Sequence, residues 1–496
     1  MSEDEKNKDE KKPAIEQEPE EVTAVTQHTI TLNGETISYT VTAGTMLLKE
    51  EEEKDSTIKT KASIFYVAYT KNGVDTPGNR PITFSFNGGP GSSSVWLHMG
   101  LLGPKRVVMA DDIGSLPAPP YQLTTNEYTI LDKSDLVFID PVSTGYSRSV
   151  PGEKPKQFHN FEKDIESVGE FIRLYTTRNM RWASPKFLAG ESYGTTRAAG
   201  LSGFLQKRYG MYLNGIMLIS SILNFQTARF TNGNDLPYIL FLPTYTAVAW
   251  YHNRLDNVLQ TDLYATLAEV EKFALGEYAL ALLRGTELPQ AEYDQIVEKL
   301  ARYTGLSPAY IRGTKLRINI HRFVKELLRD EMRTVGRLDG RFTGIDRDSV
   351  GEKHSFDPSY TNILGPYTAM FNDYIRRELN FEMDLPYEIL TGKVQPWGYD
   401  KQQNEFVDVA ETLREAISMN PYLKVLVANG YYDLATPYFA TRYTFNNMPL
   451  DPTLRQNITM TYYEAGHMMY LHMPSLAQLK QDMDAFIEQA WPAGAS

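Results

Sequence analysis

The sequence predicts an α/β fold with a mostly parallel central sheet, helices on both faces of that sheet and a helical lid insertion. Short apolar runs, typical of strands buried on both faces, alternate along the chain with amphipathic helical patterns. This alternation favours a parallel sheet between helical layers. In the middle third the strand patterns fade, helical patterns accumulate, and a buried-strand pattern then returns. We therefore predict that the middle segment is an insertion lying over the sheet.

The first predicted element is a β-hairpin. In QHTITLNGETISYTV, residues 27–41, apolar and β-branched residues flank Asn33-Gly34, a dipeptide typical of hairpin turns. An antiparallel start to the sheet is therefore expected. Later buried-strand patterns begin at Ala62, Pro81, Asp135, Lys186, Gly215 and Lys424. A helical pattern covers Phe161–Tyr175, between two of these runs.

The middle segment has the spacing of helices. Leu267, Val270 and Ala274 recur at helical intervals, and Ser307 followed by Pro308 predicts a helix start. A binding cleft is expected between this lid and the sheet. We predict four segments: a disordered acidic tail at 1–22, the N-terminal part of the core at 23–231, the helical lid at 232–395 and the C-terminal part of the core at 396–496.

Composition limits the chemistry available to the chain. Its 496 residues, of which 42% are hydrophobic, suffice for one large domain or two. The 62 acidic side chains outnumber the 50 basic ones, and the net charge of -12 argues against nucleic acid as a partner. There is no cysteine, which excludes disulfides, thiolate metal sites and cysteine nucleophiles.

The N-terminal and the most apolar segments bear on location. Residues 1–22 carry nine acidic and four basic side chains and lack the apolar region of a signal peptide. The apolar stretch at 236–250 is too short for a membrane span and contains Pro243. We expect no membrane association and a cytoplasmic location, with an exported protein whose signal sequence was removed as the alternative. The sequence does not indicate an oligomeric state.

The pentapeptide GESYG, residues 190–194, follows the strand-like run at Lys186 and precedes helix-compatible sequence. Gly-x-Ser-x-Gly in this context is typical of a nucleophile elbow, where the glycines permit a sharp turn that exposes the serine. The alternative is an ordinary turn, because two glycines around a serine also occur by chance. Ser192 is thus a candidate nucleophile, and it needs a base.

His467 and Asp433 are the candidates for the base and its orienting acid. In the fold that carries nucleophile elbows, the acid and then the histidine follow the serine. Asp433 comes after the strand-like KVLVA, and His467 comes after the strand-like NITMTYY, so both lie where active sites of parallel sheets gather. His472 is a rival base, and a loop-capping role is the alternative for Asp433. Three further histidines fall in the predicted lid: His252, His321 and His354.

The segment SFNGGPGSSS, residues 85–94, follows another strand-like run and concentrates three glycines and a proline. It is not a phosphate-binding loop, because no Gly-Lys-Ser/Thr follows. An acyl-transfer site needs backbone N–H groups that no side chain shields, in order to stabilise an oxyanion. A loop of this kind beside the elbow meets that need.

Four blocks of the sequence resemble the signature blocks of the serine carboxypeptidase family, which has the α/β-hydrolase fold. They are residues 87–94, 190–194, 430–433 and 465–468. Residues 132–147, DKSDLVFIDPVSTGYS, also resemble the family's segment between the first two blocks. The matching order of widely separated blocks argues against coincidence.

The resemblance implies an enzyme that releases C-terminal residues from peptides through an acyl-enzyme, with no cofactor and no metal ion. The implied partner is a peptide with a free C-terminus. The implied residues are Ser192 as nucleophile, His467 as general base and acid, Asp433 as the acid that orients it, the N–H groups of Gly89 and Tyr193 as oxyanion hole, and Asn87 and Glu191 as the site for the substrate carboxylate. An ionised Glu191 would repel that carboxylate, so we expect peptide hydrolysis to weaken as pH rises through the pKa of Glu191.

The chain departs from the family pattern at a few positions. Phe86 and Ser92 stand where tryptophan and cysteine are usual, so a common disulfide is missing. Leu101 replaces a glutamate of the carboxylate-binding network, and Tyr431 replaces an aspartate. No triad member is lost, but substrate preference and strict exopeptidase action are left open.

Other functions fit the same residues. The triad would also serve an esterase or an acyltransferase, and a binding protein on an inactive scaffold is a further alternative. Asp346, Asp348 and Asp357 lack the spacing of a calcium loop and are expected in a solvated acidic loop, and no His-Glu-x-x-His occurs. The aromatic residues of 365–383 are expected to pack a helix or to line an apolar subsite under the lid.

Overall fold

The computed structural model describes residues 19–52, 56–110, 113–399, 402 and 404–491. These residues form a ten-stranded sheet in the order β1-β2-β3-β7-β4-β9-β10-β13-β14, with β8 paired to β3. Its strands are β1 (Thr23–Leu32), β2 (Glu35–Glu51), β3 (Ile58–Lys71), β4 (Ile82–Phe86), β7 (Asp135–Ile139), β8 (Arg148–Ser149), β9 (Lys186–Ser192), β10 (Gly215–Ser221), β13 (Lys424–Gly430) and β14 (Ile458–Tyr463). Two small pairs are β5 (Lys105–Val107) with β6 (Leu123–Thr125) and β11 (Thr334–Val335) with β12 (Thr343–Gly344).

One edge of the sheet is antiparallel and the rest is parallel. The predicted hairpin is confirmed: β1 and β2 pair from Leu32 opposite Glu35, and Asn33 and Gly34 take φ values of 51° and 83° in the turn. The predicted run at Ala62 lies in β3, which pairs antiparallel with both β2 and β7. From β7 to β14 all neighbouring strands are parallel. The predicted α/β fold with a mostly parallel sheet is therefore confirmed.

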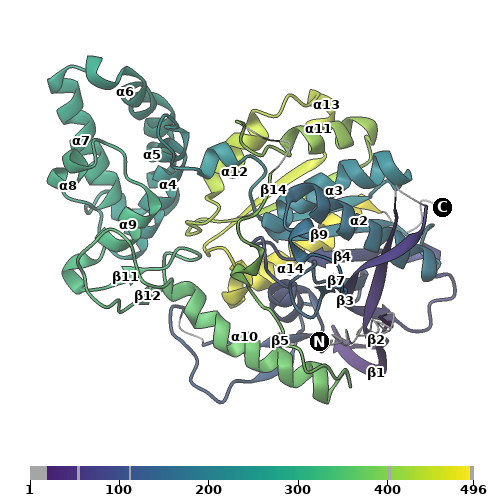
Figure 1. Cartoon of the computed structure of the whole chain (residues 1–496). Coiled ribbons are helices and arrows are strands. Elements are labelled where there is room, and N and C mark those ends of the chain that lie inside the picture. The colour runs from purple at the N-terminus through teal and green to yellow at the C-terminus, as the bar shows by residue number, and fades with distance from the viewer. Residues whose placement is uncertain (1–18, 53–55, 111–112, 400–401, 403, 492–496) are drawn as a thin grey trace, which may run out of the picture.

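Helices cover both faces of the sheet, as Figure 1 shows. One face carries α2 (Phe161–Arg178), α3 (Tyr193–Tyr209) and α11 (Ala410–Met419), and the other carries α10 (Pro358–Arg377) and α14 (Met473–Ala490). Along the central strand β10, side chains alternate between the two cores, since Ile216 packs in one and Met217 in the other. The remaining helices are α1 (Val95–Leu97), α4 (Leu236–Tyr251), α5 (Leu263–Phe273), α6 (Ala279–Arg284), α7 (Gln290–Thr304), α8 (Pro308–Gly313), α9 (Ile320–Glu326), α12 (Tyr438–Asn446) and α13 (Pro452–Arg455).

Helices α4 to α9 form a lobe beside the sheet, drawn in teal in Figure 1. They share a third apolar core, which also takes in Tyr432 and Leu434 from the loop after β13. The predicted helix start is confirmed, because the N–H of Tyr310 donates to the Ser307 hydroxyl at the beginning of α8. The lobe therefore packs directly on the loop that carries Asp433.

Helix α10 falls inside the predicted lid segment but packs against the sheet. Its Ile363, Tyr367, Phe371 and Tyr374 are buried in the same core as α14. The expectation that the aromatic residues of 365–383 pack a helix is confirmed for this helix. Within the described ranges, no helix combines the length and the apolar character needed to cross a membrane.

Part of the predicted acidic tail is ordered. Residues 1–18 lie outside the described residues, but Val22 donates its N–H to the Thr45 hydroxyl, and Glu21 accepts the N–H of Leu47. Glu21 also pairs with Arg178 at 2.8 Å. The prediction that residues up to 22 are disordered is therefore wrong for Glu21 and Val22, because these two residues form hydrogen bonds and an ion pair with groups of β2 and α2.

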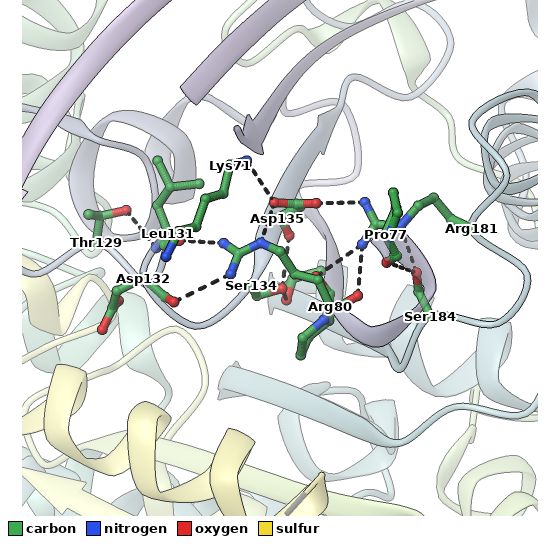
Figure 2. Close-up of polar contacts among 12 residues, drawn as sticks. Lys71, Pro77, Arg80, Thr129, Leu131, Asp132, Ser134, Asp135, Arg181 and Ser184 are labelled. Carbon is green, nitrogen blue, oxygen red and sulfur yellow. Dashed lines mark hydrogen bonds and ion pairs between the residues drawn. The ribbon is translucent and has the colours of Figure 1, made fainter. Parts of the chain in front are cut away.

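A buried ion cluster joins the amino ends of the parallel strands (Figure 2). Asp135, the first residue of β7, accepts from Nε of Arg80 at 2.7 Å and from Nη1 of Arg181 at 2.6 Å. Arg80 precedes β4 and Arg181 precedes β9, and the backbone N–H of Lys71 at the end of β3 also donates to Asp135. The cluster thus fixes four adjacent strands at the end opposite Ser192.

Candidate active site

The residues singled out in the sequence meet at the carboxyl ends of the parallel strands. The glycine-rich loop follows β4, Ser192 ends β9, Asp433 follows β13 and His467 follows β14. A pocket of about 450 Å³ opens there, between the sheet, the lid and α10. Ser192 and His467 both line it, together with Asn87, Gly88, Gly89 and Glu191. Of the other predicted site residues, Asp433 lies behind His467, and Tyr193 begins α3 beside Gly88.

Ser192 sits on the sharp turn between β9 and α3. Its φ of 61° and ψ of −129° lie in a region that non-glycine residues rarely occupy. A Cβ at Gly190 would lie 2.2 Å from the carbonyl oxygen of Gly194, and a Cβ at Gly194 would lie 2.8 Å from that of Phe86. Glycine is therefore required on both sides of the serine, and the predicted strand-turn-helix arrangement is confirmed.

The glycine-rich loop packs directly against this turn. A Cβ at Gly88 would lie 2.4 Å from the backbone nitrogen of Tyr193, so the loop and the start of α3 touch through backbone atoms alone. Gly89 follows with a φ of 102°, a left-handed conformation that favours glycine. The backbone N–H groups of Gly89 and Tyr193 thus belong to two segments in contact beside Ser192.

His467 and Asp433 form a buried hydrogen-bonded pair. Nδ1 of His467 lies 2.8 Å from Oδ2 of Asp433, which also accepts the Thr436 hydroxyl at 2.7 Å. The other Asp433 oxygen accepts the N–H groups of Ala435 and Thr436, so the carboxylate is fixed in place. A carboxylate only accepts, so we assign the imidazole proton to Nδ1, which leaves Nε2 as the basic nitrogen. Burial lowers the pKa of His467, but the charge and the hydrogen bond of Asp433 outweigh it and raise that pKa above 6.5.

Glu191 is buried beside this pair, in the wall of the same pocket. Its two oxygens accept from Nδ2 of Asn87 at 2.9 Å and from the hydroxyl of Tyr470 at 2.7 Å. Burial raises the pKa of Glu191 to about 7, from 4.5. Below pH 7 this carboxyl therefore exists mostly in its protonated form, which has an O–H to donate.

Tyr470 was not identified from the sequence, although it stands only three residues after His467. It is 3% exposed and packs against Gly100, where a Cβ would lie 2.5 Å from the tyrosine ring. Its hydroxyl is what holds the second oxygen of Glu191. Its closeness to His467 in the sequence could have marked Tyr470 as a site residue, but no motif indicates its contact with Glu191.

A lid segment at 336–341, here called the strap, was not predicted from the sequence either. It lies between the loops that carry the Asp433–His467 pair and bonds to both of them, mainly through backbone groups. The bonds run from Leu434 N to Arg337 O (3.1 Å), from His467 N to Leu338 O (2.7 Å), from Gly340 N to Tyr432 O (2.9 Å) and from Gly466 N to Oδ2 of Asp339 (3.1 Å). The lid insertion therefore helps to position the Asp433–His467 pair as well as lining the pocket.

Hydrogen bonds join the glycine-rich loop to residues 389–391. The N–H of Ser93 donates to the carbonyl of Ile389, and that of Thr391 donates to the carbonyl of Gly91. The hydroxyl of Ser92 also reaches the Ile389 carbonyl at 3.2 Å. Ser92, where the family usually has cysteine, thus takes part in a noncovalent link between two walls of the pocket.

The other candidates in the sequence lie elsewhere. His472, the rival base, bonds through Nδ1 to the Ser475 hydroxyl, and His252 bonds to the carbonyl of Gly340. His321 and His354 have ring centroids 6.0 Å apart within the lid region. Leu101 is buried in the core, and Tyr431 stacks on Tyr462.

The acidic residues considered for calcium have protein partners instead. Asp346 pairs with Lys325 at 2.5 Å, and both side chains are buried. The expectation that all three aspartates lie in a solvated loop is therefore wrong for Asp346, because a lysine from α9 neutralises it inside the protein. Asp357 accepts the N–H of Ser359 and caps the start of α10.

Fold and site together define an α/β hydrolase with a serine on a nucleophile elbow. The sequence model of the serine carboxypeptidase family matches residues 54–471. This chain therefore belongs to the serine carboxypeptidase family, as its motifs indicated.

A sequence comparison and a structure comparison show how far the likeness extends. Pheromone-processing carboxypeptidase KEX1 of Saccharomyces cerevisiae is 32% identical over 160 residues, which make up 30% of this chain but only 20% of that protein. The chain thus spans about one fifth of the length of this curated relative. The crystal structure of Kex1Δp, a prohormone-processing carboxypeptidase from the same yeast, superposes with a TM-score of 0.57 at 16% identity. That superposition covers 90% of this chain and 91% of Kex1Δp, and it shows the shared fold.

Proposed function

We propose that this protein is a serine-type carboxypeptidase that releases C-terminal residues from peptides through an acyl-enzyme. The observation that carries the proposal is the buried Glu191, whose carboxyl of raised pKa lines the same pocket as Ser192 and His467. A protonated carboxyl there can donate to the carboxylate at the end of a peptide, and this marks out a C-terminus rather than an internal peptide bond. Membership of the serine carboxypeptidase family supports this function.

In this proposal the reaction uses the residues in the following roles. The Ser192 hydroxyl attacks the carbonyl of the last peptide bond while Nε2 of His467 takes its proton, and Asp433 orients and stabilises the imidazolium. The N–H groups of Gly89 and Tyr193 stabilise the negative oxygen of the tetrahedral intermediate. His467 then protonates the leaving amine, and water hydrolyses the acyl-enzyme by the same steps.

Asn87 and Glu191 are proposed to hold the α-carboxylate of the departing residue. Asn87 already donates to Glu191, so one amide and one protonated carboxyl form a linked pair of donors. An anionic Glu191 would remove one donor and add repulsion. Peptide binding is therefore expected to depend on the protonation of Glu191.

The decisive experiment compares one N-acetylated peptide with its C-terminal amide, which lacks the carboxylate. We expect the free acid to be shortened one residue at a time, and the amide to react about 10- to 100-fold more slowly, because a hydrogen bond to a charged group is lost. Mass spectrometry of the products measures both rates, and a Ser192→Ala preparation serves as the blank. Internal cleavage, or equal rates for acid and amide, would contradict the proposal, and ester turnover without shortening would favour an esterase or acyltransferase.

The pH dependence tests Glu191 directly. Because its pKa is raised to about 7, the protonated form that binds a carboxylate is lost as pH rises through 7, so kcat/KM for free-acid peptides should fall there. Glu191→Gln keeps a donor at every pH, and it should abolish this alkaline fall. It should also move the acid limb to lower pH, because the negative charge of Glu191 helps to raise the pKa of His467. A Glu191→Gln profile that superimposes on that of the unaltered enzyme would show that Glu191 does not bind the substrate.

A further inference from the structure

The catalytic pocket contains a cation that neither the motifs nor the proposed triad uses. Arg337, from the strap, lines the pocket together with Ser192 and His467. The other ionisable side chains among the described lining residues include the carboxyls of Glu191 and Asp357 and the imidazole of His467. With Glu191 protonated and His467 neutral, Arg337 and Asp357 are the groups that carry charge in the pocket.

The backbone of Arg337 is fixed next to the catalytic loops. Its carbonyl accepts the N–H of Leu434, the residue after Asp433, and its own N–H donates to Oδ1 of Asp357. The next residue, Leu338, accepts the N–H of His467 through its carbonyl at 2.7 Å. The backbone of Arg337 is therefore fixed, because Arg337 bonds to the segment that carries Asp433 and its neighbour Leu338 bonds to His467. These bonds do not depend on the conformation of the Arg337 side chain.

The side chain itself is only loosely neutralised. It is 41% exposed, and its Nε lies 3.8 Å from Oδ2 of Asp357, too far for a hydrogen bond. Within the described part of the chain, this ion pair is the only polar contact of the guanidinium. Asp357 meanwhile directs its Oδ1 to the backbone N–H groups of Arg337 and Ser359. The guanidinium therefore keeps N–H donors available to a second anion.

We infer that Arg337 binds a carboxylate of the substrate in the catalytic pocket. The inference rests on the proposed function, which brings at least one carboxylate into this pocket in every turnover. A guanidinium offers paired donors that match the two oxygens of a carboxylate, and a side chain exposed on one face can adjust to meet it. The carboxylate has two sources: the α-carboxylate of the departing residue, or an acidic side chain next to the scissile bond.

The test compares Arg337→Gln with the unaltered enzyme on three substrates: a peptide with neutral residues at its C-terminus, a matched peptide with a C-terminal glutamate, and a blocked amino-acid ester that carries no carboxylate. We expect kcat/KM to fall about 10- to 100-fold wherever the carboxylate that Arg337 binds is present, and to stay unchanged for the ester. Losses on both peptides assign Arg337 to the α-carboxylate, and a loss confined to the glutamate peptide assigns it to the side chain. Arg337→Lys should restore part of the activity, because it keeps the charge without the paired donors.

The controls separate binding from damage to the site. Arg347→Gln alters an exposed lid arginine paired with Asp348, and it should leave all three substrates unchanged. Equal losses on the ester and the peptides, or no loss on any of them, would overturn the inference. If the unaltered enzyme hydrolyses the ester but shortens no peptide, the proposed function fails on its own. Inhibition of ester hydrolysis by a free-acid dipeptide then decides the inference, because Arg337→Gln should weaken that inhibition about 10-fold or more.

Discussion

Ser192→Ala is expected to lower kcat for peptide shortening about a million-fold, as removal of the nucleophile does in other serine proteases. In the proposed mechanism the Ser192 hydroxyl forms the acyl-enzyme, so this substitution removes the attacking group. Residual turnover would come from the oxyanion hole and from substrate binding alone. The rates are measured by mass spectrometry on the free-acid peptide, with long incubations for the variant.

The controls for Ser192→Ala test whether the loss is chemical. Ser192 already adopts a positive φ, and alanine places a Cβ in the same position, so the elbow should keep its shape. Thermal unfolding and dipeptide binding should therefore match those of the unaltered enzyme. A serine-directed fluorophosphonate should add its mass to the unaltered protein and leave Ser192→Ala unlabelled. Retention of peptide shortening or of labelling by the variant would place the nucleophile elsewhere.

The fold was predictable where its signals are local. A buried strand needs only a short apolar run, and the runs at Pro81, Asp135 and Lys186 became the adjacent parallel strands β4, β7 and β9. The Asn33-Gly34 turn was also predictable from the dipeptide alone, since both residues accept positive φ. The direction of each strand was harder to predict from the sequence. The run at Ala62 is as apolar as the other runs, yet β3 pairs antiparallel with β2 and β7. Distant segments of the chain determine which strands pair.

The site divides in the same way. Gly190 and Gly194 could be anticipated from the turn they permit, although only the structure reveals which carbonyl oxygens a Cβ would strike. The strap and Tyr470 could not be found, because they act on Asp433, His467 and Glu191 through contacts that leave no spacing in the sequence. The raised pKa of Glu191 is likewise a property of its burial. Short motifs thus predict the candidate catalytic residues better than the residues that hold them in position.

The largest expected effect on stability comes from Asp135→Asn. The side chains of Asp135, Arg80 and Arg181 are all 10% exposed or less, so the two guanidiniums depend on this carboxylate for neutralisation. Breaking a buried ion pair by removing one partner costs about 3–5 kcal/mol, because a charge remains buried without compensation. We expect the urea midpoint of unfolding, followed by tryptophan fluorescence, to fall accordingly.

The position of the cluster makes this prediction selective. The cluster (Figure 2) lies at the amino ends of β4, β7 and β9. Ser192 and the pocket lie at the carboxyl ends of the parallel strands. Asp135→Asn should therefore leave kcat/KM at 25 °C close to that of the unaltered enzyme while the urea midpoint falls. Glu488→Gln is the matched control, because it breaks the exposed ion pair between Glu488 and Lys133. Lys133 stands two residues before Asp135 in the sequence, and exposed ion pairs contribute little to stability. Equal midpoints for the two variants would mean that the arginines find other acceptors, and that their hydrogen bonds to backbone carbonyls suffice to hold the strand ends together.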